Sequence, residues 1–403
     1  MNDFTVSQAS SVLNSIVAQA TGSAAITPIT NNGDFIAVAQ TLLKTGYDTV
    51  INAVSQVFSR SIFAYRDYNA ENSDLEMDMP RYGNAVRKLS PVARTMQDDE
   101  RFIYPVAYDA VNYPGNPLGD GLSVDHYKIN KQDVLQTNFY GTAVYQQRYT
   151  IFKDQFDVAF SSLEEFGRFA AMLLGERKND RESYKEGIAR GLQANFIGAI
   201  LDEGATDRVI HLLTEYNALT GLSLTASTVY QPANFAPFMR WAFSRIKTVA
   251  RLMAARSENF QTAISGKRIL RHTSAENLRI AMFAPIMEQF KAMVLSDTFH
   301  DEYLNRATLE EVNYWQSIDT PAGIQVTPIY TDSTGALKTG NAVNNATVVG
   351  ILHDRDAMGY AFTNTWSATT PLNIDGGYWN EAYHANVKTI QDNTEKAVVL
   401  CLD

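Results

Sequence analysis

A single long amphipathic stretch constrains the fold of this chain more than any other feature. Ser162-Leu163-Glu164-Glu165 forms a capping box, with an N-cap serine three residues before a glutamate. A helix over residues 163–201 would be about 58 Å long at 1.5 Å per residue. That exceeds the diameter of a typical single domain, so the helix is either a spine or kinked at Asn179-Asp180, where short polar side chains compete for the backbone. Its apolar residues recur at spacings of mostly 3 and 4: Leu163, Phe166, Phe169, Ala170, Leu173, Leu174, Tyr184, Ile188, Leu192, Phe196 and Ile200.

Residues 67–157, which precede this helix, lack helical periodicity. Prolines interrupt the segment at Pro80, Pro91, Pro105, Pro114 and Pro117. Residues 124–130 alternate partially, and residues 139–152 are rich in Tyr, Val and Thr, as strands are. About ninety residues of extended chain are unusual inside a compact domain. The segment is therefore either a small β-subdomain or a projecting β-hairpin loop whose partners lie on a neighbouring subunit.

The first sixty residues contain interrupted helical patterns at residues 7–20 and 36–58, with a polar break at residues 21–33. Each pattern has a narrow apolar face. Such a segment fits either an arm that packs on another surface or the first helices of the core.

The remainder of the chain mixes helical and strand patterns. A helix is expected over residues 235–256, with Lys247, Arg251 and Arg256 towards its C-terminal end, where the helix dipole favours cations. Further elements are expected as strands at 268–273, 278–283, 311–318, 348–352, 360–363, 385–391 and 397–402, and as a helix at 285–294. This mixture predicts an α/β or α+β domain.

Composition excludes several classes of protein. The chain has 44 acidic and 34 basic residues and a formal net charge of −10, whereas gripping a phosphate backbone takes clustered Lys and Arg. The single cysteine, Cys401, permits no disulfide within the chain. No secretory signal and no apolar run of roughly 20 residues is visible, so we expect a cytosolic protein without membrane contact. With 20 Tyr, 20 Phe and only 19% charged residues, the composition fits wide protein–protein contacts or an aromatic-rich core.

The sequence contains no recognisable catalytic, cofactor-binding or metal-binding motif. The His300-Asp301-Glu302 and His353-Asp354-Arg355-Asp356 clusters contain possible metal ligands, but adjacent residues on a strand point to opposite faces. Residues 115–121 lack the Lys-Ser/Thr pair of a phosphate-binding loop. We therefore expect no cofactor, no metal and no enzymatic activity.

A short basic stretch, with Arg81, Arg87, Lys88 and Arg94 beside Tyr82, resembles a nucleic-acid-binding arm. The acidic run Asp98-Asp99-Glu100 follows at once and offsets it. Contact with an acidic patch on a neighbouring subunit agrees better with the total charge.

In order along the chain, these features resemble the major capsid proteins of tailed bacteriophages with the Hong Kong 97 fold. Residues 82–88 (YGNAVRK), 127–133 (YKINKQD) and the strand leading into residues 160–162 (FSS) resemble the extended-loop region of head proteins from small podovirus-type phages. Residues 351–360 (ILHDRDAMGY) and 380–403 resemble the C-terminal end of such proteins. The resemblance is diffuse but spans nearly the whole chain.

The resemblance implies an α+β fold divided by region. Residues 1–60 would be an N-terminal arm, 61–81 the start of a peripheral domain, and 82–152 an extended β-hairpin loop on the adjacent subunit. Residues 153–204 would add the spine helix to the peripheral domain. The remaining regions would be an axial domain at 205–345, peripheral strands at 346–394 and a C-terminal axial strand at 395–403. Inter-subunit contacts would involve Tyr82, Arg87, Lys88, Tyr113, Tyr127, Lys128 and Lys131.

The resemblance also implies a function and partners. The protein would assemble as pentamers and hexamers into an icosahedral head in the host bacterial cytoplasm, reside in the virion, and enclose double-stranded DNA without sequence-specific binding. Portal and scaffolding or decoration proteins would be its partners. Some members of the fold crosslink Lys to Asn; Lys128 and Lys131 are candidates, but no motif assigns the Asn. An encapsulin-type bacterial compartment shell and a cytosolic α/β enzyme or binding protein are the alternatives.

Overall fold

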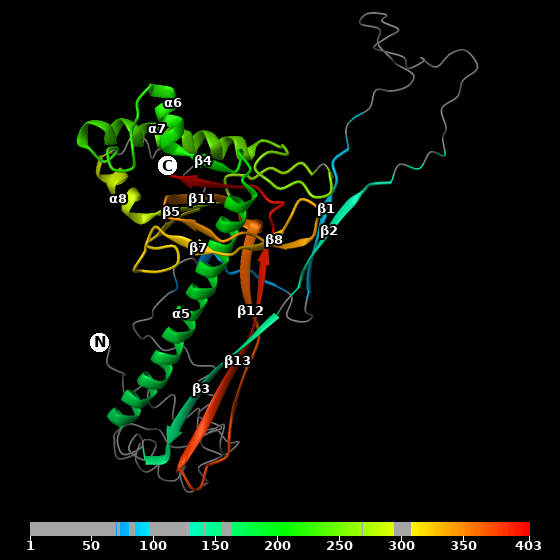
Figure 1. Cartoon of the computed structure of the whole chain (residues 1–403). Coiled ribbons are helices and arrows are strands. Elements are labelled where there is room, and N and C mark those ends of the chain that lie inside the picture. The colour runs from blue at the N-terminus through cyan, green and yellow to red at the C-terminus, as the bar shows by residue number, and fades with distance from the viewer. Residues whose placement is uncertain are drawn as a thin grey trace, which may run out of the picture.

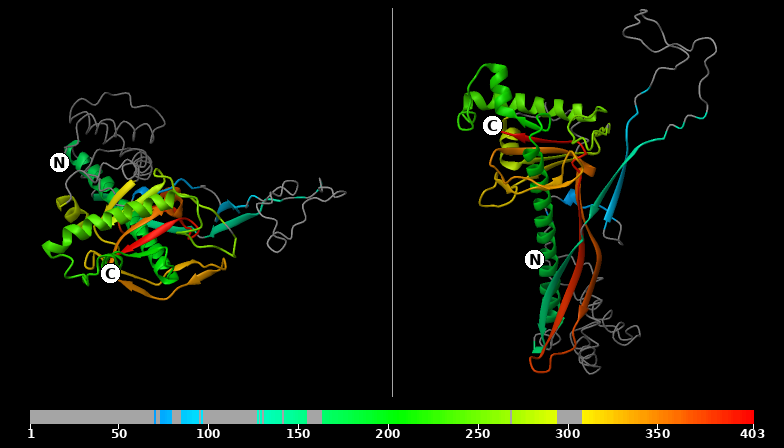
Figure 2. Two further views of the ribbon diagram at one scale, coloured as in Figure 1. Left: turned by 90° about the horizontal axis from the view of Figure 1, so that it is seen from above. Right: turned by 45° about the vertical axis from the view of Figure 1, so that its right-hand side comes forward.

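The computed structural model describes residues 70, 73–79, 85–94, 96, 127, 129, 131–140, 142–154, 163–267, 269–293 and 308–403. These residues form an elongated molecule (Figure 1). A helix- and sheet-containing body occupies one end, and the long helix α5 (Leu163–Glu203) runs from it beside a narrow sheet. A two-stranded hairpin leads away from the body on the other side (Figures 1 and 2). No helix within these ranges is both long and apolar enough to cross a membrane.

The body is built on a five-stranded sheet with the order β4-β14-β11-β5-β6. β14 pairs parallel to β4, and β5 pairs parallel to β6, whereas β11 is antiparallel to both of its neighbours. The strands are β4 (Val209–His211), β5 (Leu278–Phe283), β6 (Thr308–Val312), β11 (Val348–Asp354) and β14 (Ala397–Cys401). The predicted domain division groups β11 with the strands that follow it, but its hydrogen bonds join it to β5 and β14 in this sheet.

Two apolar cores lie on opposite faces of this sheet. One core contains Val398 and Leu400 of β14 together with buried residues of α6 (Leu212–Thr220), α7 (Pro232–Ala254) and α8 (Ala284–Met293). The other contains Ala397, Val399 and Cys401 of β14 and the C-terminal half of α5. Because both faces are covered, β14 reads as an uninterrupted apolar run instead of an alternating one. Burial also raises the pKa of the Cys401 thiol to about 12.

Helix α5 is a single 41-residue helix, which confirms the expected helix over residues 163–201. It continues through Asn179 and Asp180, where a kink was the alternative. The charged middle of the helix has partners on the neighbouring sheet: Arg177 pairs with Glu381 at 2.6 Å, and Asp180 accepts hydrogen bonds from Gln147 and Tyr149 at 3.0 Å each. Polar residues there serve an interface instead of breaking the helix. The capping serine, Ser162, lies outside the described residues.

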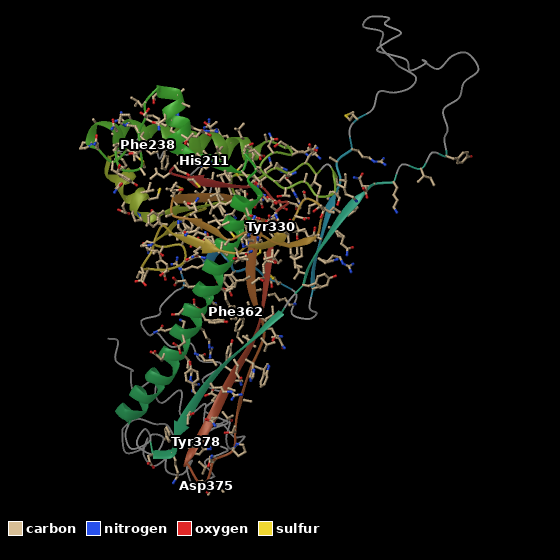
Figure 3. The ribbon with its side chains drawn as sticks, viewed as in Figure 1. His211, Phe238, Tyr330, Phe362, Asp375 and Tyr378 are labelled. Atoms are coloured by element: carbon tan, nitrogen blue, oxygen red, sulfur yellow. The ribbon has the colours of Figure 1, made fainter. Side chains whose placement is uncertain are left out.

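The narrow sheet beside α5 has three strands in the order β12-β13-β3. Its strands are β3 (Thr142–Phe152), β12 (Met358–Thr369) and β13 (Tyr378–Gln391). One face packs on α5, as the contact of Arg181 with the Tyr383 ring at 3.9 Å shows. Figure 3 shows Tyr378 and Asp375 at the far end of this sheet, distant from Phe238 in the body.

The hairpin consists of β1 (Ala85–Pro91) and β2 (Val134–Tyr140), paired antiparallel from Ala85↔Tyr140 to Pro91↔Val134. The strand expected over residues 124–130 falls mostly outside the described residues, and Tyr127 and Ile129 are not in a strand. The N-terminal patterns at residues 7–20 and 36–58 also fall outside them. Short elements complete the fold: η1 (Ser73–Leu75), η2 (Arg355–Ala357), β7 (Ile324–Val326), β8 (Ile329–Thr331), β9 (Leu337–Thr339) and β10 (Val343–Asn345).

Most of the other predicted elements are confirmed, with two corrections. α7, α8, β5, β11, β12, β13 and β14 all lie where the sequence predicts them. The strand expected over residues 268–273 is wrong, because within 269–273 only Arg271 makes an isolated bridge, to Ser257. The strand expected over residues 311–318 is instead β6, which ends at Val312.

Candidate interaction surfaces

A buried polar turn joins β13 to β14 and anchors the hairpin. Its residues are Asp392, Asn393, Thr394, Glu395 and Lys396, all almost completely buried, and we call it the 392–396 turn. The Asp392 side chain accepts hydrogen bonds from the backbone N–H of Thr394 at 2.9 Å and from its hydroxyl at 2.6 Å. The Lys396 ammonium donates to the Ala255 carbonyl and to the Ser257 hydroxyl, both at 2.8 Å. Asp392, Thr394 and Lys396 are thus held in the interior by specific partners, as buried polar groups require. The side-chain amide of Asn393 is buried without a hydrogen-bond partner among the described residues, and only its backbone carbonyl accepts, from the Thr262 N–H at 2.9 Å.

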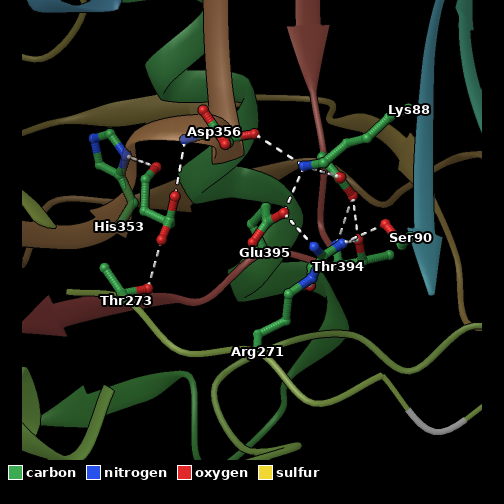
Figure 4. A network of polar contacts seen from close by, with 10 residues as sticks. Lys88, Ser90, Arg271, Thr273, His353, Asp356, Thr394 and Glu395 are labelled. Carbon is green, nitrogen blue, oxygen red and sulfur yellow. Dashed lines mark hydrogen bonds and ion pairs between the residues drawn. The ribbon is translucent and has the colours of Figure 1, made fainter. Parts of the chain in front are cut away.

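Lys88 of β1 reaches into this turn (Figure 4). Its ammonium lies 2.7 Å from an Asp392 carboxylate oxygen and 2.5 Å from a Glu395 carboxylate oxygen. It also donates to the Asp356 carbonyl at 3.4 Å. One side chain of the hairpin therefore joins three groups of the body.

Arg271 completes the anchor from the loop between α7 and β5. Its guanidinium pairs with Glu395 at 2.9 Å and donates to the Ser90 hydroxyl at 2.9 Å, so a second residue of β1 is tied to the same turn (Figure 4). It also donates to the Thr394 hydroxyl at 3.1 Å. Further along the hairpin, Lys267 of the same loop pairs with Asp133 at 3.1 Å.

The charges of the anchor shift one another's pKa values in a consistent way. Burial disfavours the charged form of Lys88, but Asp392 and Glu395 outweigh this and raise its pKa. Burial acts to raise the pKa of Asp392, but Lys88 and the Thr394 hydrogen bonds bring it below its usual value. Burial dominates for Glu395 and raises its pKa despite Lys88 and Arg271. The ammonium of Lys88 is thus the main electrostatic support of the buried Asp392 carboxylate.

Residues His353 to Asp356, which the sequence offered as a possible metal site, make hydrogen bonds beside the 392–396 turn. The Asp354 side chain accepts from the Thr273 hydroxyl at 2.7 Å and from the Asp356 backbone N–H at 3.0 Å (Figure 4). His353 is buried, with its Nδ1 2.8 Å from the Asp354 carbonyl, and burial lowers the pKa of its ring to about 4. Among the residues that the structure describes, no three His, Cys, Asp or Glu side chains are grouped so as to hold a metal ion.

A second polar joint fixes the β8–β9 hairpin to the end of α5. The Asp202 carboxylate accepts hydrogen bonds from the Tyr330 hydroxyl at 2.7 Å and from the backbone and side-chain nitrogens of Asn341 at 3.1 and 2.8 Å. Lys338 lies 3.4 Å away. Led by the Tyr330 hydrogen bond, these donors lower the pKa of Asp202 to about 2. Figure 3 shows Tyr330 where this hairpin meets the body.

Asp202→Asn is expected to lower the free energy of unfolding by about 2 kcal/mol at neutral pH. The folded-state pKa lies below the ordinary value of about 3.9, so the contribution of Asp202 is fully present above that value and is lost as pH falls towards 2. Denaturant unfolding of wild type and variant should therefore differ at pH 7 and converge between about pH 4 and 2. A difference that stays constant down to pH 2 would contradict this assignment.

The outer hairpin face is the exposed side of β1 and β2. Alternation places Lys88 and Ser90 on the side towards the body and leaves the other side outward. Leu89 is 60% exposed and Tyr140 76% exposed on the outward side. The outer hairpin face comprises Arg87, Leu89, Pro91, Val134, Gln136 and Tyr140. Exposed apolar residues beside a cation, on a hairpin that leads away from its own body, suit contact with another molecule.

A second exposed apolar surface is the side of the three-stranded sheet that faces away from α5. Trp366 is 49% exposed and stacks on His384 with ring centroids 4.0 Å apart. The Nε2 of Gln146 on β3 lies 3.3 Å from the His384 Nε2. Val144 and Phe152 of β3 are also exposed on this side.

The predicted contact residues do not all have the same environment. Arg87 is exposed on the outer hairpin face, Tyr127 is 90% exposed, and Lys131 is exposed, with its carbonyl accepting from Arg94 at 2.5 Å. Lys88 instead directs its ammonium into its own subunit. The other three, Tyr82, Tyr113 and Lys128, lie outside the described residues.

Sequence reasoning missed Leu89, Tyr140 and Trp366 as surface residues. The alternation of β1 and β2, once the two strands are paired in register, is the signal that could have found the first two.

Known proteins share this fold. A model of the family described as Phi29-like phage major capsid protein matches residues 118–401, more than half of the chain. The structure is similar to the capsid structure of Staphylococcus phage Andhra, with 10% identity, a TM-score of 0.50, and coverage of 85% of this chain and 88% of that chain. A structure of the head fiber and inner core protein of native bacteriophage P68 has 8% identity and a TM-score of 0.50, and the match covers 85% of this chain and 87% of that chain. No curated protein matches the sequence.

Proposed function

Because the chain belongs to the family of Phi29-like phage major capsid proteins, we propose that it assembles through pentamers and hexamers into an icosahedral head that encloses double-stranded DNA. The family match over residues 118–401 is the observation that carries this proposal. It favours a phage head over an encapsulin-type compartment and over an α/β enzyme or binding protein. Assembly takes place in the host bacterial cytoplasm, and the finished protein resides in the virion.

The elongated shape supports a division of labour by region. In this proposal residues 82–152, which include β1, β2 and β3, contain the extended loop that lies on an adjacent subunit. α5 is the spine of a peripheral domain formed by residues 61–81, 153–204 and 346–394, and β11 at the start of the last range joins this domain to the axial sheet through its hydrogen bonds with β5 and β14. Residues 205–345 and 395–403 form an axial domain whose tips, residues 217–221, 333–340 or both, meet around the symmetry axes. Residues 1–60 form an arm over a neighbour.

The outer hairpin face contains the residues that we propose contact the adjacent subunit. Arg87 and the exposed apolar residues beside it contact the neighbour, together with Tyr127 and Lys131. Tyr82, Tyr113 and Lys128 are proposed contacts on the same extended loop. Lys88 contributes differently, because its ammonium holds the hairpin on its own body.

In this proposal assembly depends on the shape of the subunit and on the large number of contacts between subunits. A strand whose edge groups are unpaired can add to a neighbouring sheet, and many such modest contacts on a closed shell act together. Portal and scaffolding or decoration proteins complete the head. The net charge of −10 means that the shell repels the phosphates of packaged DNA, which lets the DNA move along its inner surface during filling.

Electron microscopy of the chain, purified and co-expressed with a scaffolding protein, tests the proposal. We expect closed shells with pentameric and hexameric capsomers. Monomers or dimers at every concentration, with and without the scaffolding protein, would count decisively against it.

Deletion of residues 114–121 is expected to spare folding of the subunit and to abolish shell formation. These residues lie outside the described ranges, and their Gly- and Pro-rich sequence is typical of a loop tip. Circular dichroism and thermal unfolding report the fold of the variant, and microscopy reports its assembly. Loss of the folded subunit would show instead that the segment belongs to the core of its own chain.

A further inference from the structure

A long uncharged segment lies at one end of the body. Residues 216–239 contain no Asp, Glu, Lys, Arg or His, although charged residues make up 19% of the chain. Within the described ranges, no other stretch is free of charge for so long. The segment runs from α6 through the following loop into α7, at the end of the body away from the three-stranded sheet (Figure 1).

The exposed side chains of this segment are apolar or carry hydroxyl groups. Leu219 is 69% exposed and Leu222 47% exposed, and Tyr230 is exposed beside them. Depletion of charge beside exposed apolar and aromatic side chains is typical of the centre of a protein–protein interface. We call the exposed residues of this region the neutral tip: Ala218, Leu219, Thr220, Gly221, Leu222, Ser223, Thr225, Ala226, Ser227 and Tyr230.

The loop of the neutral tip is held in one shape by its own polar groups. The Asn217 side chain accepts from the Leu224 N–H at 2.9 Å and donates to the Leu224 carbonyl at 2.8 Å. The Thr225 N–H donates to the Thr228 hydroxyl at 2.8 Å, and the Val229 N–H donates to the Thr225 carbonyl at 2.9 Å. A surface with a fixed shape loses little conformational entropy on binding, so the neutral tip is already prepared for a contact.

The chemistry of the neutral tip suits contact with further copies of the same chain. Near a rotation axis, equivalent residues of all the copies converge. A charged residue there would meet its own charge, whereas leucines pack against leucines and a hydroxyl both donates and accepts. Leu219, Thr220, Leu222 and Ser223 meet this requirement. The other loop considered for the axis, residues 333–340, instead exposes a lysine.

We propose that the neutral tip, and not the loop of residues 333–340, is the surface through which copies of this chain contact one another at the centre of a pentamer or hexamer. The inference rests on the proposed function, which supplies the ring of copies. Leu219 and Leu222 of each copy pack against those of the next. Because each copy has a net charge of −10, an uncharged surface at the point of convergence avoids adding to the repulsion between copies.

Crosslinking through a single introduced cysteine tests where the copies meet. Cys401 is the one cysteine of the chain and is buried, so an introduced, exposed cysteine is the thiol that reacts. In assembled Leu222→Cys, a bifunctional maleimide should link the copies into covalent dimers and no larger species. Leu337→Cys, at an exposed leucine of the loop of residues 333–340, is the matched control and should remain monomeric. Dimers of Leu337→Cys without dimers of Leu222→Cys would overturn the inference.

Charge substitution tests whether like residues contact one another. L222E and L222K should each fold, as circular dichroism reports, but each should lower the yield of assembled particles at least about tenfold, because like charges then converge. Co-expression of the two variants should restore assembly, since neighbouring copies can then carry opposite charges. L337E is the control and should assemble as wild type does. Normal assembly of folded L222E, or no recovery in the mixture, would contradict the proposed contact.

The same experiments separate this inference from the proposed function. Shells whose copies do not crosslink at position 222 contradict the inference alone. Rings that crosslink at position 222 but never close into shells support the inference and contradict the proposed shell. A chain that stays monomeric under all conditions contradicts both.

Discussion

Replacing Lys88 with methionine is expected to lower the free energy of unfolding of the subunit by about 3 kcal/mol, the lower end of the range for breaking a buried ion pair. Methionine keeps most of the apolar stem but removes the ammonium 2.7 Å from Asp392. The Asp392 side chain is only 2% exposed, so its carboxylate stays out of water without its main cation. Denaturant unfolding of the unassembled chain measures the loss.

The adjacent residue provides a matched control. Arg87 lies on the opposite side of the same strand and is exposed, so Arg87→Met should change the free energy of unfolding by no more than about 0.5 kcal/mol. Hydrogen exchange adds a local readout, because the amides of β1 should exchange faster in Lys88→Met than in Arg87→Met. Identical unfolding midpoints and exchange rates for the two variants would show that the 392–396 turn does not anchor the hairpin.

Gly350→Val is expected to cost about 3 kcal/mol and to prevent accumulation of folded subunit at elevated temperature. Gly350 lies in the middle of β11, paired with Met282 on one side and with Leu400 on the other. A Cβ at this position would lie 2.4 Å from the Met282 sulfur and 3.0 Å from the Ala281 carbonyl oxygen. The sulfur can move, but the carbonyl belongs to the neighbouring strand and cannot move without disturbing the sheet.

Gly187→Ala is the control for this substitution. Gly187 is an exposed position in α5, and a Cβ there meets no atom within 4 Å. Alanine should therefore raise the free energy of unfolding by about 0.5–1 kcal/mol through its helix propensity. Thermal unfolding of both variants measures the contrast. An unchanged melting temperature for Gly350→Val would contradict the close strand packing described for β11.

The spacing of apolar residues along the sequence correctly predicted the long helices and the strands of the C-terminal tail. The 3- and 4-residue spacing that includes Leu192, Phe196 and Ile200 identified α5, and the spacing around Phe238 identified α7. The alternation or apolar content of the tail identified β11 to β14. The same reasoning failed at residues 268–273, where the adjacent apolar residues Ile269 and Leu270 between polar ones were taken as a short strand. There the Gln261 side chain donates to the Ile269 carbonyl at 2.5 Å, and Arg271 reaches Thr394, so local polar partners replace a ladder.

The anchor of the hairpin could not have been predicted in the same way. The 392–396 turn reads as a solvated loop, since four of its five side chains are charged or amide groups. Its burial depends on Lys88, about 300 residues earlier in the chain, and no periodicity relates the two positions. Lys88 was accordingly expected at a subunit contact together with Arg87. Only the pairing of β1 with β2 shows that neighbouring residues of one basic stretch face opposite ways.

The position of β14 has a consequence for how the subunit is made. β14 lies between β4 and β11 in the sheet. β4 therefore cannot form its hydrogen bonds with β14 until β14 is synthesised, about 190 residues later. At 5–20 residues per second, that delay is roughly 10–40 s on the ribosome. Throughout this time both apolar cores lack the residues that β14 contributes to them. We therefore expect the nascent chain to need protection from aggregation until β14 has been synthesised and has paired with β4 and β11.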